Sequence, residues 1–208
     1  MGVILSKRKA AKGLSAEDII IVVVGPTGAG KSTFINLVTA SDQLAVGKGL
    51  STCTKEIKHV RWTPETEGQR RRQVVFVDTP PLFDPEQTRS HSEKQMEKKI
   101  NDWLKKSYGK RLRVFGILYL YRISDNRMTD PPYPNFQMFQ RLLGAKYHPR
   151  VLLVTTMWEI VSPKAGEQRK KEVEKHWQEM TAHGSAVLTH NGKRESAQSI
   201  VQRLLDQR

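Results

Sequence analysis

The stretch Asp18-Ile-Ile-Ile-Val-Val-Val-Gly-Pro-Thr-Gly-Ala-Gly-Lys-Ser-Thr33 is the strongest indication of the fold. Its first part is a run of β-branched residues, which is typical of a strand buried on both faces of a parallel sheet. Its second part, from Gly25 to Thr33, matches the pattern G-x-x-x-x-G-K-[ST]. Residues 31–40 then carry apolar side chains at helical spacing. A strand, a glycine-rich turn and a helix therefore follow one another, which predicts a P-loop.

This turn has the chemistry of a phosphate site. Glycines allow successive backbone N–H groups to face a common centre, and the following helix directs its positive end at the same point. We expect Lys31 to reach the β- and γ-phosphates of a nucleoside triphosphate, Ser32 to bind Mg²⁺ and Thr33 to contact the α-phosphate. The remaining expected nucleotide contacts come from the loop itself, which consists of Gly25, Pro26, Thr27, Gly28, Ala29 and Gly30. The alternative is a glycine turn without a ligand.

A second candidate for the metal site is Asp78. It ends the apolar run Gln73-Val-Val-Phe-Val77, and Thr79-Pro80-Pro81 stops any continuation of that strand. A carboxylate in this place normally holds Mg²⁺ through water. The position means little alone, because many strands end in aspartate, but beside a P-loop it predicts a nucleotide site that requires a metal.

Strands and helices alternate along the rest of the chain. We expect strands at 18–24, 56–63, 73–77, 114–120, 151–155 and 185–189, and helices at 31–40, 92–107, 135–143, 167–180 and 196–205. The short turn at 64–68 forces the two strands that it joins to run antiparallel. The chain is therefore predicted to be a three-layer α/β P-loop domain, with a mostly parallel six-stranded sheet and one antiparallel edge strand. We place this domain at 18–208 and a flexible basic segment at 1–17.

From Val22 to about Met180 the chain resembles the septin-like G domains, and is similar to the immunity-associated nucleotide-binding GTPases and the chloroplast import-receptor GTPases. The resemblance is carried by Gly25-Pro-Thr-Gly-Ala-Gly-Lys-Ser-Thr-Phe-Ile-Asn-Leu37, Cys53-Thr-Lys-Glu-Ile57, Phe76-Val-Asp-Thr-Pro80, Tyr121-Arg-Ile-Ser-Asp-Asn-Arg-Met128 and Leu153-Val-Thr-Thr-Met-Trp158. It implies a GTP/GDP switch that uses Mg²⁺ and forms a homodimer through its nucleotide face. It also implies that Thr54 is the switch threonine, which binds Mg²⁺ and acts in catalysis with Lys31; Thr52 is the competing candidate.

Two departures from the GTPase pattern bear on hydrolysis. GTPases usually carry Asp-x-x-Gly after the third strand, where the glycine N–H senses the γ-phosphate, but the aligned residue here is Pro81, which has no N–H. A neighbour such as Leu82 or Phe83 would have to substitute. No glutamine is placed to orient the attacking water as the template requires. We therefore expect hydrolysis to be slow, absent or dependent on a partner.

The residues that would read the base also depart from the usual pattern. Guanine is usually read by the aspartate of an Asn/Thr-Lys-x-Asp motif, whereas this chain has Thr155-Thr-Met-Trp-Glu159 at the end of the fifth strand. Thr156, Trp158 and Glu159 are the candidates here: Glu159 for the carboxylate and Trp158 for stacking on the base. The alternatives are a packed aromatic residue and a solvated charge. GTP is favoured over ATP because the antiparallel hairpin around the turn at 64–68 resembles that of the GTPases.

Two arginines follow the fourth strand. Arg122 and Arg127 are candidates for arginine fingers within a pair of molecules. The alternative for each is a surface charge or an ion pair with Asp125.

The first residues and the net charge suggest an anionic partner. Met1-Gly-Val-Ile-Leu-Ser6 fits the myristoylation pattern at Gly2, and Lys7, Arg8, Lys9 and Lys12 follow it. One acyl chain with an adjacent basic patch binds an anionic membrane surface, so we expect a cytoplasmic protein that is peripheral on the cytosolic face of a membrane. The formal net charge of +14 fits this expectation. A single cysteine, Cys53, favours a reducing compartment.

Three functional hypotheses follow. The first is a Mg²⁺-dependent GTP switch with slow or assisted hydrolysis, and the second is a non-hydrolysing module whose bound nucleotide organises a dimer or a membrane scaffold. The third is a nucleic-acid binder with a vestigial P-loop, for which Arg70-Arg71-Arg72 would contact phosphates. Nucleic acid is the least favoured partner, because no aromatic-interleaved basic stripe is present.

Overall fold

The computed structural model describes residue 15 and residues 17–46, 56–64, 72–81, 89–108, 114–125, 136–143 and 148–207. Six strands form one sheet in the order β2-β3-β1-β4-β5-β6. The strands are β1 Ile19–Val24, β2 Lys58–Trp62, β3 Val74–Asp78, β4 Gly116–Arg122, β5 Val151–Thr156 and β6 Ala186–Thr189. All neighbouring strands run parallel except β2 and β3, which confirms the predicted antiparallel edge strand.

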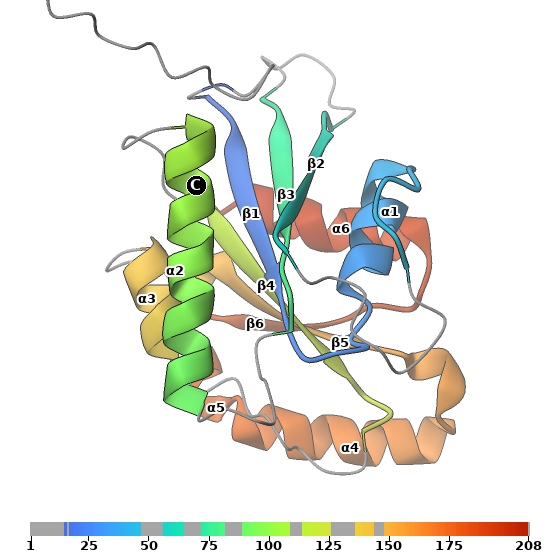
Figure 1. Ribbon diagram of the computed structural model, residues 1–208. Coiled ribbons are helices and arrows are strands. Elements are labelled where there is room, and N and C mark those ends of the chain that lie inside the picture. The colour runs from blue at the N-terminus through green and yellow to red at the C-terminus, as the bar shows by residue number, and fades with distance from the viewer. Residues whose placement is uncertain are drawn as a thin grey trace, which may run out of the picture.

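Helices cover both faces of this sheet, as predicted (Figure 1). One face carries α1 Lys31–Thr39 and α6 Arg194–Leu205. The other carries α2 Arg89–Tyr108, α3 Phe136–Leu143, α4 Pro163–His176 and α5 Gln178–Ala182. Two short 3₁₀ turns, η3 His148–Arg150 and η4 Trp158–Ile160, flank β5. Because successive strand residues point to opposite faces, each strand supplies side chains to two separate apolar clusters, one under each helical layer.

The topology positions the site. β1 lies in the middle of the sheet, between β3 and β4, and it is parallel to both. Its carboxyl end therefore opens at the same edge as the carboxyl ends of its neighbours, which is where open α/β sheets bind ligands. This edge lies at the bottom of Figure 1.

The helix predicted at 167–180 is two helices in the structure. α4 begins earlier, at Pro163, because the Ser162 hydroxyl caps it by accepting a bond from the Ala165 N–H at 3.3 Å. The helix is interrupted at Trp177, whose side chain is fully buried and packs edge-on against Tyr119 and Tyr121. The expectation that Trp177 points inward is confirmed. The periodicity did not reveal the break, because both segments keep their apolar residues on the same side.

The fourth strand is also displaced from its predicted range. It occupies Gly116–Arg122 instead of 114–120, so Arg122 ends the strand and does not lie in the following loop. No helix within the described residues is both long enough and apolar enough to cross a membrane.

Candidate functional site

The glycine-rich turn between β1 and α1 lies at the carboxyl edge of the sheet (Figure 1). Gly25, Gly28 and Gly30 have φ values of 148°, 74° and 81°, which residues other than glycine rarely adopt. Gly30 is the N-cap of α1, where no side chain forms a capping bond and no acidic residue occupies the first turn. The N-cap residue therefore supplies no side-chain partner to the first N–H groups of α1, and a helix end of this kind favours an anion.

Lys31 is folded over this turn. Its Nζ donates hydrogen bonds to the carbonyl oxygens of Gly25, at 2.9 Å, and Pro26, at 3.0 Å, and the residue is 7% exposed. Burial lowers the pKa of Lys31 to about 8, and the nearby carboxylate of Asp78 acts in the opposite direction. The ammonium group thus remains mostly protonated at pH 7 and lies within the loop that is expected to hold phosphates.

The two candidate metal ligands are in direct contact. The Ser32 hydroxyl donates to Oδ2 of Asp78 at 2.8 Å, although 46 positions separate them in the sequence. Asp78 is fully buried at the end of β3, and Ser32 is half-buried in the first turn of α1. A hydroxyl and a carboxylate are hard oxygen donors of the kind that Mg²⁺ prefers, and Mg²⁺ usually takes one or two protein ligands beside water and phosphate. These residues therefore fit the ion.

Threonines support the turn from the sheet. The Thr156 hydroxyl donates to the carbonyl oxygens of Ala29, at 3.1 Å, and Tyr121, at 3.3 Å. Thr79 donates to the carbonyl oxygen of Val23 at 2.9 Å. Both threonines are buried. Thr156, which is also a predicted nucleotide contact, thus supports the backbone of the loop through its hydroxyl.

Glu159 lies on the exposed surface of η4, just after β5. Met157, two residues before Glu159, has a left-handed φ of 60°. Its methyl group lies 3.3 Å from the position that a Cβ on Gly30 would occupy. η4 therefore begins directly beside the P-loop. The Glu159 carboxylate faces the turn after β6, because Oε2 lies 3.9 Å from a Cβ built on Gly192.

The turn that faces Glu159 was missed by the sequence analysis. The His190 N–H donates to the Thr155 carbonyl oxygen at 2.8 Å, and its ring packs edge-on against Phe34 of α1 at 5.1 Å. Burial lowers the pKa of His190, and Glu159 opposes this shift. The dipeptide Asn191-Gly192 after the last strand is a turn signal that marks this segment in the sequence. Its approach to Glu159 depends on tertiary contacts.

Trp158 is held by the protein itself. Its Nε1 donates to the Thr155 hydroxyl at 3.0 Å, and its six-membered ring lies 2.8 Å from the position of a Cβ on Gly166 in α4. Only glycine at position 166 leaves room for this contact. The indole is therefore packed against α4, which is the packed-aromatic alternative.

Arg122 lies against the tip of the P-loop. One of its guanidinium nitrogens, Nη1, is 2.7 Å from the position of a Cβ on Gly28. Its other nitrogens contact the carboxylate of Asp125 at 2.9 and 3.2 Å, so the alternative of an ion pair is observed. Arg169 of α4 donates to the carbonyl oxygens of Ile123 and Ser124 and so fixes this segment.

Several predicted residues lie outside the described residues, namely Gly2, Thr52, Thr54, Leu82, Phe83 and Arg127. Pro81 is described and half-buried, and Thr33 is exposed. The structure thus brings Lys31, Ser32 and Asp78 together, with Glu159 on the adjoining turn.

Comparison with known proteins agrees with this geometry. A family model described as 50S ribosome-binding GTPase matches residues 20–130, which is more than half of the 208-residue chain. No curated protein matches the chain.

Solved structures with the same fold include Toc33 from Arabidopsis thaliana. Its complex with Mg²⁺ and GMPPNP is 17% identical with a TM-score of 0.63, over 92% of this chain and 86% of that chain. Its complex with GDP and Mg²⁺ is 17% identical with a TM-score of 0.64, over 91% and 84%. A further structure, described by the statement that dimerization is important for the GTPase activity of the chloroplast translocon components atToc33 and psToc159, is 16% identical with a TM-score of 0.60, over 91% and 82%. The expected resemblance to chloroplast import-receptor GTPases is thus confirmed at the level of the fold.

Proposed function

The chain belongs to the 50S ribosome-binding GTPase family, and we propose that it is a Mg²⁺-dependent guanine-nucleotide switch with slow or partner-assisted hydrolysis of GTP. One observation carries the proposal: Lys31 and the bonded pair Ser32 and Asp78 converge on the N-terminus of α1, where the N-cap residue is a glycine. A buried ammonium, a hydroxyl and a carboxylate around a ring of backbone N–H groups suit a triphosphate with its metal. The nucleotide complexes of Toc33 favour guanine as the base.

Each residue has a distinct part in this proposal. Lys31 leaves the carbonyl oxygens of Gly25 and Pro26 and binds the β- and γ-phosphates, while Ser32 and Asp78, with Thr54 from the switch segment, hold Mg²⁺. The metal, when bound, neutralises charge on the phosphates. Water attacks the γ-phosphorus in line with the leaving oxygen, and Lys31 with the loop N–H groups stabilises the negative charge that develops.

Two assays test this proposal. Acid should release GDP or GTP from the purified protein, and single-turnover hydrolysis of radiolabelled GTP at stoichiometric protein should exceed the rate of the Lys31→Ala variant. If copurified GTP stays unchanged over hours, the enzymatic half of the proposal is lost and the binding half stands. If neither GTP, GDP nor ATP with Mg²⁺ produces heat or raises the unfolding temperature, the whole proposal is wrong.

Replacing Asp78 with asparagine should remove the metal dependence of binding. Asparagine keeps the size of the side chain and still accepts a bond from Ser32, but it lacks the charge that favours Mg²⁺. We expect Mg²⁺ to strengthen GTP binding by at least about tenfold in the parent and by much less in Asp78→Asn, since a charge-assisted contact is worth about 1.5–3 kcal/mol. Calorimetry with Mg²⁺ and with EDTA measures the difference. Asp102→Asn, which removes an exposed carboxylate bonded to Lys98, is the matched control.

Replacing Glu159 with glutamine should weaken the choice of base. A carboxylate accepts from both the N1–H and the exocyclic N2–H of guanine, whereas a glutamine side chain has only one accepting oxygen. We expect GTP affinity to fall about tenfold, and the affinity for inosine triphosphate, which lacks N2, to fall less. Competition binding of the two nucleotides measures both. Equal losses for both, or a similar change in the exposed control Glu167→Gln, would exclude a role for Glu159 in reading the base.

The second candidate is a dimerisation module that does not hydrolyse GTP. Pro81 favours this candidate, because proline lacks the N–H that would sense the γ-phosphate. The apolar side chain of Ile160, in the turn η4 that begins beside the P-loop, is 66% exposed. Arg122 lies against Gly28, at the same edge. A homodimer through this face is therefore part of the second proposal. Sedimentation with a non-hydrolysable GTP analogue and with GDP shows whether the nucleotide controls pairing.

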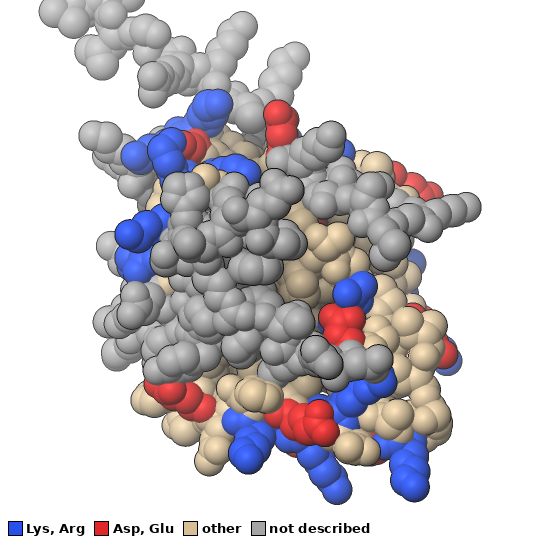
Figure 2. Space-filling model, turned by 60° about the horizontal axis from the view of Figure 1, so that its bottom comes forward, with Lys and Arg blue, Asp and Glu red and all other residues tan. Residues whose placement is uncertain are grey.

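Attachment to a membrane rests on the sequence of the first residues. We propose that Gly2 is acylated and that the following basic residues hold the chain at the cytosolic face of an anionic membrane. Figure 2 shows the side of the molecule that bears the carboxyl edge, and the acidic and basic side chains of the described residues on it are interspersed. Flotation with anionic vesicles, with and without acylation, tests the attachment.

A further inference from the structure

The outer edge of β6 lacks a neighbouring strand in the described part of the chain. β6 is the last strand of the sheet and pairs only with β5. The Leu188 carbonyl oxygen accepts the Thr155 hydroxyl at 3.2 Å and the His190 N–H donates to the Thr155 carbonyl at 2.8 Å, so these two residues direct their backbone groups toward β5. Along a strand, the N–H and C=O groups of successive residues point to opposite edges. The N–H and C=O groups of Val187 and Thr189 therefore point to the open edge of β6.

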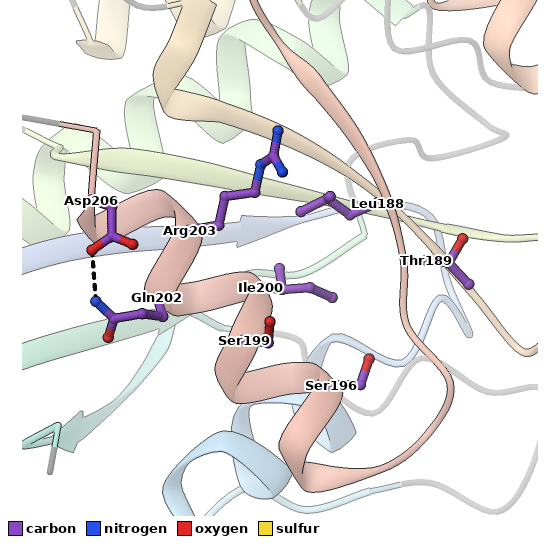
Figure 3. Close-up of a pocket in the computed structure, with 8 residues that line it drawn as sticks. All are labelled: Leu188, Thr189, Ser196, Ser199, Ile200, Gln202, Arg203 and Asp206. Carbon is purple, nitrogen blue, oxygen red and sulfur yellow. Dashed lines mark hydrogen bonds between the residues drawn. The ribbon is translucent and has the colours of Figure 1, made fainter.

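A groove runs beside this edge. It has a volume of about 480 Å³ and lies between β6 and α6 (Figure 3). Leu188 and Ile200 give it an apolar floor, and Thr189, Ser196 and Ser199 add hydroxyl groups. A strand added to β6 would therefore place alternate side chains over the groove.

The charges of the groove indicate what it binds. The groove carries one charge of each sign. Asp206 keeps its negative charge although it accepts a bond from the neutral amide of Gln202 at 2.8 Å, whereas Arg203 is exposed and has no ion pair among the described residues. In Figure 3 the Arg203 side chain extends from α6 on the same side as Leu188. The segment 1–14 of the chain itself carries lysine and arginine but no acidic residue, so Arg203 would repel it, and a second copy that paired through the same edge would bring its own Arg203 there. An acidic segment is attracted by the same charge.

We propose that the open edge of β6 binds an extended segment of an acidic partner protein. The segment pairs with the backbone of Val187 and Thr189, sets an apolar side chain on Leu188 and Ile200, and brings a carboxylate to Arg203. None of the residues that line the groove belongs to the proposed phosphate and metal site, so the proposal does not depend on GTP binding. One end of the groove, at Thr189 and Ser196, adjoins the turn that faces Glu159.

Nuclear magnetic resonance of the full-length, ¹⁵N-labelled protein tests the proposal with a defined probe. The probe is a blocked six-residue peptide that alternates valine and threonine and carries one glutamate; a second peptide carries lysine instead. We expect the glutamate peptide to shift the amide signals of Val187 and Thr189 and to slow their hydrogen exchange. Arg203→Glu should weaken binding of this peptide by about fivefold or more and should favour the lysine peptide.

The matched control is Arg194→Glu, which makes the same charge change in the first turn of α6, at a residue that does not line the groove. It should leave the affinity within about twofold, and equal unfolding temperatures would show that both variants fold. The proposal is overturned if no shift occurs at Val187 and Thr189 up to millimolar peptide, or if Arg203→Glu binds both peptides as the parent does. It is also overturned if these signals move with protein concentration alone, because the edge would then pair with a second copy.

Discussion

Replacing Lys31 with alanine is expected to weaken GTP binding by at least about 100-fold. Each hydrogen bond from a charged group contributes about 1.5–3 kcal/mol, and Lys31 is placed to contact two phosphates, so the loss is about 3 kcal/mol or more. The neutral carbonyl oxygens that hold Nζ now, at 2.9 and 3.0 Å, are weaker partners than a triphosphate. Calorimetric titration with GTP and Mg²⁺ measures the change.

The matched control for this variant is Lys164→Ala, which removes an exposed lysine from the first turn of α4. It makes the same change in net charge away from the P-loop, so it should alter the affinity by less than about twofold. Unfolding temperatures of both variants without nucleotide show whether the fold is intact. A folded Lys31→Ala protein that binds GTP as tightly as Lys164→Ala would contradict the proposed phosphate site.

The glycine-rich turn of the proposed phosphate site was predictable because its geometry is local. The turn from Gly25 to Gly30 needs left-handed backbone conformations, and the glycines that permit them stand in the sequence next to the strand and the helix that they join. The partnership of Ser32 with Asp78 followed from topology, because the carboxyl ends of adjacent parallel strands share an edge. The antiparallel pairing of β2 with β3 followed from a different local signal, the short turn at 64–68 that joins the two strands.

Other parts of the site depend on contacts that no local pattern encodes. In the sequence, Trp158 is a candidate for stacking on a base. The contact of its ring with α4 at Gly166, where no side chain stands in the way, is visible only in the structure. Glu159 meets the turn at Gly192, which follows a different strand. The placement of Arg122 against Gly28 requires β4 to end two residues later than its apolar run predicts. Each of these contacts joins segments that are distant in the sequence.

Replacing Gly25 with alanine is expected to destabilise the nucleotide-free protein by about 2–4 kcal/mol, because the backbone conformation and the neighbouring strand both oppose a side chain. The residue has a φ of 148°, which favours glycine. A Cβ there would lie 2.2 Å from the carbonyl oxygen of Leu120, inside β4, and this backbone cannot turn aside as a side chain can. Urea unfolding of the two proteins measures the change in the free energy of unfolding.

Gly30→Ala separates the two causes. Gly30 also has a positive φ, of 81°, but its Cβ would meet only the flexible methyl end of Met157, at 3.3 Å. We therefore expect Gly30→Ala to lower the free energy of unfolding by about 1–2 kcal/mol, which is the effect of the left-handed conformation alone. A loss for Gly25→Ala no larger than that for Gly30→Ala would show that the loop can move away from β4. In that case the position of Lys31, whose Nζ is bonded to the Gly25 carbonyl oxygen, would not depend on this close contact with the sheet.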